Sequence, residues 1–358
     1  LPGRLMHDGA LNTPGESRDA VAVTLKDVDW SSLLAHNAPP LWAVIDGVNC
    51  RDVSDKTASD DVQSTCLYTS ADPSTRMMAP WLVRIEPDGG IVDWLAGLPQ
   101  DQHWGILLQS HATLRQLRAH LRKYTMLWTP ADAEAPVYFR FYDPRVALDM
   151  MQAIEPWKLA RFFKDIGRLI LPVTPLMLLP ENAGLAPAPE LDAKPGDYGG
   201  RLISVTPDDA RIDDGGPSRA FRIGHVEYAR FGALQKRRSN MKMARELLET
   251  YPDRTAAETL EAVEAGGRIG KPIDMISVRQ IRALARCVLE FGFDFAANYG
   301  DAATILDNPT TAPWRKCDLL EQWIPRGRIR RDLLAEIARD EQSFPETIRQ
   351  NAKRGEST

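Results

Sequence analysis

Two aspartates and a histidine are the residues whose positions could support chemistry. Asp46 and Asp143 each follow a run of apolar residues, at 41–45 and 137–142, and His103 comes just before another run. In α/β proteins, ligands and reacting groups gather at the ends of strands. Carboxylates and an imidazole at such ends could act as general acid and base. One hypothesis is therefore an α/β enzyme with an atypical site around Asp46, Asp143 and His103.

The same two aspartates also have a simpler structural interpretation. Asp46 is followed by Gly47, a pair typical of a turn. Asp143 precedes Pro144, and aspartate before proline is a common start of a helix, in which the carboxylate caps the first turn. We favour this interpretation for both residues.

Other motifs for catalysis or for binding a cofactor are incomplete. The stretch from Gly266 to Lys271 is one residue short of a phosphate-binding loop, and Pro272 stands where that loop needs serine or threonine. The sequence contains no GxSxG or HExxH motif, and its four cysteines form no CxxC pair. The sequence thus offers no complete catalytic motif, and we expect no cofactor and no metal.

Two basic clusters are the remaining candidates for a binding site. They lie at Lys236–Arg238 and at 326–331, where Arg328, Arg330 and Arg331 could meet the phosphates of a nucleic acid. The formal net charge of -5 and a pI near 5.8 argue against such binding by the chain as a whole. We expect no nucleic-acid partner and interpret both clusters as solvated helix faces, with contact to an acidic protein partner as the alternative.

The elements of the first half alternate between apolar runs and helix-like segments. Between the runs at 104–109 and 137–142, Leu114, Leu117 and Leu121 recur at helical spacing after Ser110, which we expect to be the N-cap. Runs that are apolar throughout suit strands buried on both faces. Strand, helix and strand in alternation predict crossover connections. We predict an α/β fold with a mainly parallel sheet and flanking helices, followed by a separate all-helical lobe.

At roughly 150 residues per domain, a chain of 358 residues is long enough for two domains. Its composition divides it into two lobes and three further segments. A segment rich in proline and glycine separates two lobes, and the second lobe has apolar stripes at helical spacing. The expected parts are an N-terminal extension (1–37), the α/β domain (38–172), a linker or long loop (173–218), the helical lobe (219–345) and a tail (346–358).

The hydropathy pattern predicts no membrane segment. The most apolar stretch, 169–179, contains two prolines and is shorter than the roughly 18 residues of a membrane helix. The first twenty residues lack the apolar core of a signal peptide. We expect a soluble, cytoplasmic protein with no membrane partner.

Five segments of the first domain, in order, resemble one protein family. They are PLWAVIDG (40–47), APWLVRI (79–85), HWGI (103–106), LRQLRAHLRK (114–123) and FRFYDPRV (139–146). Together they resemble the DUF4123 family, although Trp42 stands where that family often has tyrosine. The resemblance covers roughly residues 40–170.

The resemblance implies a cytosolic, non-enzymatic adaptor chaperone of type VI secretion in a Gram-negative bacterium. Such a protein would bind a cognate toxic effector, encoded nearby, and help load it onto the VgrG spike protein. Protein interfaces concentrate their binding energy in aromatic and arginine side chains, and methionine-rich surfaces adapt to varied partners. On these grounds our candidate partner-binding residues are Arg140, Tyr142, Asp143, Arg145, Phe231, Met241 and Met243.

Overall fold

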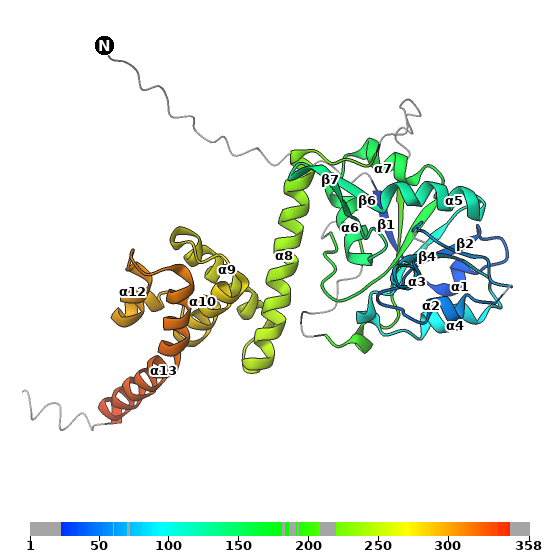
Figure 1. Cartoon of the computed structure of the whole chain (residues 1–358). Helices are drawn as coiled ribbons and strands as arrows, with labels where there is room; N and C mark the ends of the chain where they lie inside the picture. The colour runs from blue at the N-terminus through cyan, green and yellow to red at the C-terminus, as the bar shows by residue number, and fades with distance from the viewer. Residues whose placement is uncertain are drawn as a thin grey trace, which may run out of the picture. The chain divides into compact units, whose positions relative to one another are not determined.

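The computed structural model divides the chain into two compact units (Figure 1). The first comprises residues 1–188 and 195–232, and the second comprises 189–194 and 233–358. The structure describes residues 23–59, 61–69, 72–180, 183–185, 191, 193–207 and 220–343. The predicted tail at 346–358 lies outside these ranges.

The first unit is built on a seven-stranded sheet in which every neighbouring pair of strands is antiparallel. Its spatial order is β1 (Val23–Val28), β9 (Leu202–Pro207), β8 (Arg168–Pro172), β5 (Gly105–Gln109), β2 (Leu41–Asp46), β4 (Pro80–Ile85) and β3 (Ser64–Cys66). The predicted mainly parallel sheet is therefore wrong. Strand β1 lies within the predicted extension 1–37, and β9 lies within the segment 173–218.

Burial on both faces accounts for the continuous apolar runs without any parallel strands. Every residue of β2 is buried. On one face, Leu41, Ala43 and Ile45 share a core with helices α1 (Trp30–Leu33), α2 (Val53–Lys56) and α4 (Gly90–Ala96). Figure 1 shows these helices on one side of the sheet, with α5 and α7 on the other. Successive side chains of β2 point to opposite faces of the sheet, and helices cover both faces. The residues from 41 to 45 are therefore all apolar, whether the neighbouring strands run parallel or antiparallel.

The helices of the second face are α5 (Leu114–Leu121), α6 (Pro144–Ala153) and α7 (Pro156–Phe163), which contact β4, β8 and β9 respectively. Helix α5 is capped by Thr113, and not by Ser110 as the spacing suggested. The Thr113 amide donates to Gln116 Oε1 at 2.9 Å, and the Gln116 amide returns to Thr113 Oγ1. This reciprocal capping box satisfies two backbone donors at once. The Ser110 hydroxyl instead donates to the carbonyl of Asp165.

A separate hairpin of β6 (Met126–Thr129) and β7 (Asp132–Tyr138) stands apart from the main sheet. Of the apolar run at 137–142, only Val137 and Tyr138 lie in a strand, at the end of β7, and residues 139–142 lie outside the strands. The ring of Phe139 packs against the rings of Phe221 and Phe231. The residues that follow Phe139 lead directly to the start of α6. Short 3-10 helices occur at η1 (Gln100–Gln102), η2 (Arg122–Tyr124) and η3 (Pro195–Tyr198), and α3 (Pro73–Met77) precedes β4.

The second unit is helical, as the periodicity predicts. It contains the end of α8 (His225–Thr250), α9 (Ala256–Gly270), η4 (Lys271–Ile273), α10 (Val278–Phe291), α11 (Phe295–Asn298), α12 (Gly300–Asp307) and α13 (Pro313–Ser343). Gly266 lies inside α9, where a Cβ would stand 2.8 Å from the carbonyl oxygen of Ile281 in α10. Gly266, the first glycine of the incomplete phosphate-loop motif, therefore allows α9 and α10 to pack closely, whereas a Cβ at Gly267 would meet no atom within 4 Å. None of the described helices is long and apolar enough to cross a membrane.

Candidate functional site

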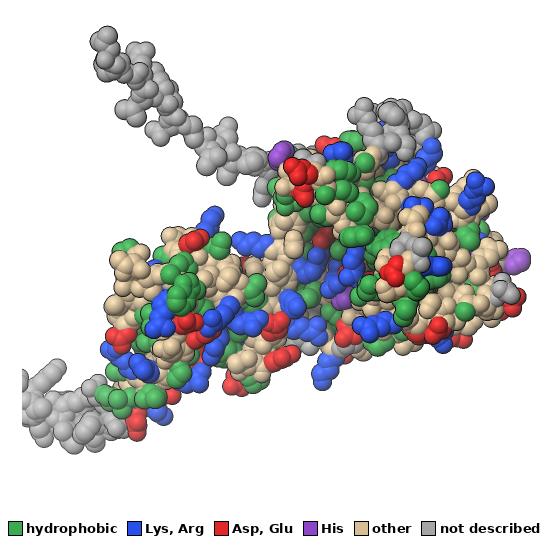
Figure 2. Space-filling view, in the orientation of Figure 1, with side chains coloured by type: hydrophobic (Ala, Val, Ile, Leu, Met, Phe, Trp, Pro, Cys, Tyr) green, Lys and Arg blue, Asp and Glu red, His purple; other side chains and the backbone are tan. Residues whose placement is uncertain are grey.

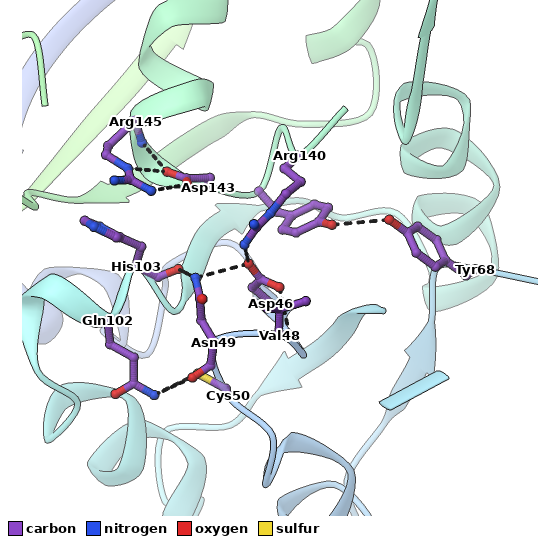
Figure 3. Close-up of polar contacts among 11 residues, drawn as sticks. Asp46, Val48, Asn49, Cys50, Tyr68, Gln102, His103, Arg140, Asp143 and Arg145 are labelled. Atoms are coloured by element: carbon purple, nitrogen blue, oxygen red, sulfur yellow. Dashed lines mark hydrogen bonds and ion pairs between the residues drawn. The ribbon is translucent and has the colours of Figure 1, made fainter. Parts of the chain in front are cut away.

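The carboxylate of Asp46 forms the centre of a polar cluster at the end of β2 (Figure 3). The residue is fully buried. The chain turns immediately after it, so the predicted Asp46–Gly47 turn is confirmed. Within this turn, Asp46 Oδ1 accepts from the Val48 amide at 3.0 Å, and Oδ2 accepts from Asn49 Nδ2 at 3.2 Å. Local hydrogen bonds thus fix the orientation of the carboxylate.

Arg140 completes this arrangement by forming an ion pair with Asp46. It comes from the segment that follows β7, and its side chain is 40% exposed whereas that of Asp46 is 0% exposed. Burial raises the pKa of Asp46 and outweighs the opposing effect of the Arg140 charge. For Arg140, burial acts to lower the pKa, but the Asp46 carboxylate raises it overall. The pair therefore joins a buried carboxylate to a guanidinium that is partly exposed to solvent.

Tyr142 packs beneath Arg140 and is itself inaccessible. The guanidinium carbon of Arg140 lies 6.0 Å from the centre of the Tyr142 ring, and Tyr142 is 2% exposed. Its hydroxyl lies 3.3 Å from the hydroxyl of Tyr68. Burial raises the pKa of Tyr142 well above its ordinary value, so the phenol stays neutral. The Tyr142 ring packs against the Arg140 guanidinium, and Tyr142 itself is too buried in this structure to contact a partner directly.

Asp143 forms the second buried ion pair, with Arg145. It is the N-cap of α6, where its Oδ1 accepts from the Arg145 amide at 2.9 Å and its Oδ2 lies 2.7 Å from Arg145 Nη2. Burial acts to raise the pKa of Asp143, but the hydrogen bonds and charge of Arg145 outweigh it and lower the pKa. The predicted capping role is confirmed. We call Asp46, Arg140, Tyr142, Asp143 and Arg145 the Asp46 cluster.

His103 lies beside the cluster but is not aligned with either carboxylate. Its backbone is left-handed, with φ at 48°, and its carbonyl accepts from Asn49 Nδ2 at 3.1 Å. Figure 3 shows Asn49 between the imidazole and Asp46. The buried Nδ1 atom of His103 has no hydrogen-bond partner in the described part of the chain. The structure thus gathers the three residues of the enzyme hypothesis, but each carboxylate is already paired with an arginine.

The His103 environment predicts a specific dependence of stability on pH. Burial, with a smaller effect from Arg145, lowers the pKa of His103 to about 4. In the unfolded chain the pKa of a histidine is about 6.5, so as pH falls the unfolded state takes up this proton before the folded state does. The free energy of unfolding therefore decreases as pH falls from about 6.5 to 4. Between pH 7 and pH 5 we expect the free energy of unfolding to fall by about 2 kcal/mol through this residue. Urea unfolding of wild type and His103→Asn should show a flatter pH profile for the variant. Equal slopes would contradict the assignment.

Four exposed apolar residues border the Asp46 cluster, and sequence reasoning missed all of them. Val48 belongs to the turn after Asp46, and the Tyr138 ring lies 5.8 Å from the ring of Tyr68. Met77 and Met78 end α3, whose backbone meets the Asp46 turn where the Gly47 amide donates to the carbonyl of Ala79 at 3.1 Å. These residues, from 45% to 71% exposed, are Val48, Met77, Met78 and Tyr138, and we call them the rim. The paired methionines were the only visible signal in the sequence.

The three candidates from the predicted helical lobe are divided between the two units. Phe231 belongs to the first unit, where its ring lies 6.1 Å from that of Phe139. Met243 belongs to the second unit and is 4% exposed within its core. Met241 is partly buried.

The basic cluster at the end of the chain is largely paired within the second unit. Arg328 and Arg331 both form ion pairs with Glu290, and Arg330 lies 3.8 Å from Asp301. The negative charges of Glu290 and Asp301 therefore offset part of the positive charge with which the arginines could attract the phosphates of a nucleic acid. No group of histidine, cysteine and acidic residues that could hold a metal occurs in the described ranges.

The first unit is thus an antiparallel sheet covered by helices, with two buried Asp–Arg pairs close to one end of β2. Residues 41–161 match the model of a protein family described as a domain of unknown function, DUF4123. The match spans β2 to α7 and includes the whole Asp46 cluster, and it confirms the resemblance at the level of the domain family. No curated protein and no solved structure matches the chain significantly.

Proposed function

We propose that this chain is a non-catalytic adaptor that binds a cognate type VI secretion effector and helps load it onto the VgrG spike. The proposal extends the match of residues 41–161 to DUF4123 by the role that the resemblance implies. The observation that carries it is the Asp46 cluster with its rim. Buried charges there are paired internally, while apolar and aromatic side chains are exposed beside an accessible arginine.

The chemistry of this surface suits a protein partner better than a small substrate. Aromatic residues, methionine and arginine are enriched at the centres of protein interfaces. Flexible methionine side chains adapt to varied apolar surfaces, as Met77 and Met78 would against an effector. Arg140 could donate to an effector carboxylate or carbonyl while Asp46 holds its guanidinium in place.

The polar cluster has the features of a scaffold for this surface. The turn after Asp46 sets the position of Val48, and the Arg140 ion pair fixes the segment that continues from Tyr138. Prepositioned side chains lose less conformational freedom on binding, which strengthens affinity. We therefore assign Asp46, Tyr142, Asp143 and Arg145 to positioning, and the rim with Arg140 to contact.

The direct test is co-purification of the tagged full chain with the products of neighbouring genes and with VgrG. A stable complex with a toxin-like neighbour, formed without added nucleotide or metal, would support the proposal. Recovery of neither a toxin-like neighbour nor VgrG under conditions where the chain is folded would remove its main support.

Charge placed on the rim should weaken this complex. We expect Tyr138→Glu combined with Met78→Glu to reduce effector affinity at least about tenfold, because interface anchors typically contribute more than ~1 kcal/mol each. The matched control is Val278→Glu, an equally exposed apolar position at the start of α10 in the second unit. Isothermal titration of purified variants checks this, and unchanged affinity in the rim variant would exclude the rim as the binding surface.

A further inference from the structure

The end of helix α13 carries an apolar stripe that the core of the second unit does not cover. The first part of α13 packs through Cys317, Leu320, Trp323 and Ile324. This packing ends near Gly327, where a Cβ would stand 3.0 Å from the ring of Phe291. Beyond it, Ile329, Leu333 and Ile337 are 71%, 55% and 47% exposed. Figure 1 shows these last turns projecting beyond α10 and α12.

The three residues of this stripe lie on one side of the helix. They follow one another at intervals of four residues, which keeps them within about 80° of each other at 3.6 residues per turn. An apolar stripe of this kind on an otherwise polar helix normally faces another surface. Leu333 is its midpoint.

Charged side chains flank the stripe in a pattern that is complementary to itself. Arg330 comes three residues before Leu333, and Glu336 comes three residues after it. Both lie at the edges of the stripe and are exposed. If the helix is turned end over end about Leu333, the basic end of the stripe comes to the level of the acidic end, so that Arg330 lies level with Glu336 and Ile329 with Ile337.

We propose that the stripe of Ile329, Leu333 and Ile337 binds the same stripe of a second copy of this chain, with the two helices antiparallel and Leu333 close to the twofold axis. In this arrangement Ile329 packs against Ile337 of the second copy, and Arg330 pairs with its Glu336. A symmetric dimer uses one patch twice, so both ion pairs form together. A parallel arrangement would instead place Arg330 against Arg330.

The existing contact of Arg330 does not prevent this pairing. Its guanidinium lies 3.8 Å from Asp301, and the two side chains are 57% and 74% exposed. Exposed pairs of this kind contribute little to stability and exchange readily. Because each copy contributes a single helix, the interface lies at the small end of the usual range. We expect a reversible dimer with a dissociation constant on the order of micromolar.

Charge reversal with sedimentation velocity over a concentration series tests the dimer. The full chain should shift from monomer to dimer as concentration rises. Arg330→Glu alone and Glu336→Arg alone should each weaken dimerisation by about tenfold, because each places like charges opposite one another twice. The double variant R330E/E336R should restore it. A wild-type chain that stays monomeric up to about 100 μM, well above the expected dissociation constant, or a double variant no better than the singles, would overturn the proposal.

A cysteine at Leu333 gives an independent test that this face of the helix forms the interface. Facing helices 8–10 Å apart bring the two Leu333 Cα atoms within roughly the 4.4–6.8 Å that a disulfide spans. The four native cysteines are buried. With added diamide as oxidant, Leu333→Cys should form a covalent dimer quickly, whereas Ala335→Cys, on the opposite side of the helix, should not. Equal cross-linking at both positions would contradict the placement of this stripe in the interface, while the charge-reversal variants test the antiparallel orientation.

Discussion

Replacing Arg140 by methionine is expected to lower the free energy of unfolding by about 3 kcal/mol. The substitution keeps the aliphatic stem over Tyr142 but leaves Asp46, which is 0% exposed, without its counter-charge. Removing one partner of a buried ion pair typically costs about 3–5 kcal/mol, because the other charge remains buried. We place the effect at the lower end because Arg140 is itself 40% exposed. Urea unfolding at neutral pH measures it.

Two further variants separate the ion pair from other effects of the Arg140 substitution. The double variant D46N/R140M should recover much of the lost stability, since no buried charge is left unpaired. The control Arg315→Met removes an arginine that is 49% exposed and 3.9 Å from Asp318, and it should cost less than about 0.5 kcal/mol. If R140M costs no more than R315M, the Asp46–Arg140 pair does not hold the site together.

Gly47→Ala should be comparably damaging, with an expected cost of about 3 kcal/mol or a failure to fold. A Cβ at this position would stand 2.3 Å from the carbonyl oxygen of Met77 and 2.5 Å from that of Ala79. Both are backbone atoms, so the end of α3 and its methionines must move away from the Asp46 turn. Overpacking of this kind typically costs about 1–3 kcal/mol, and more where backbone must shift.

Gly90→Ala is the matched control for this prediction. Gly90 begins α4, and a Cβ there would meet no atom within 4 Å. Alanine in an unobstructed helical position should be neutral or stabilise by up to about 1 kcal/mol. Thermal unfolding of both variants gives the comparison. Similar melting temperatures for the two would show that the close approach at Gly47 does not constrain α3.

Local signals in the sequence correctly predicted the local parts of the site. The cap at Asp143 and the turn at Asp46 both depend on hydrogen bonds to residues within three positions, so residue types alone reveal them. The helical character of the second lobe was also predicted, because apolar residues recur there at helical spacing. Ser110 and Thr113 are both good caps, and only the Gln116 side chain distinguishes them.

Strand direction could not be predicted, because it depends on contacts between distant residues. Strand β2 pairs with β4 and with β5, and nothing within its own apolar run specifies how those neighbours run. The strand β9 escaped notice because its short run of residues lies within a segment dominated by proline and glycine. The partnership of Asp46 with Arg140 likewise joins residues 94 positions apart.

In the proposed function, partner binding depends on rim residues that carry no motif. Met77, Met78 and Tyr138 are ordinary residues in the sequence, and folding places their segments around one turn. An adaptor needs such a surface more than it needs reactive groups, since it must bind one protein and release it to another. The self-complementary end of α13 would add a second interface, which two copies of the adaptor share.

The most direct test of the adaptor account is whether VgrG acquires the effector only when this chain is present. Purified tagged VgrG would be mixed with the candidate effector, with and without the chain, and the effector retained on VgrG would be quantified. We expect strong retention with wild-type chain, loss with the rim variant Y138E/M78E, and retention with V278E. Effector bound to VgrG equally well without the chain, or not bound even with it, would contradict the account.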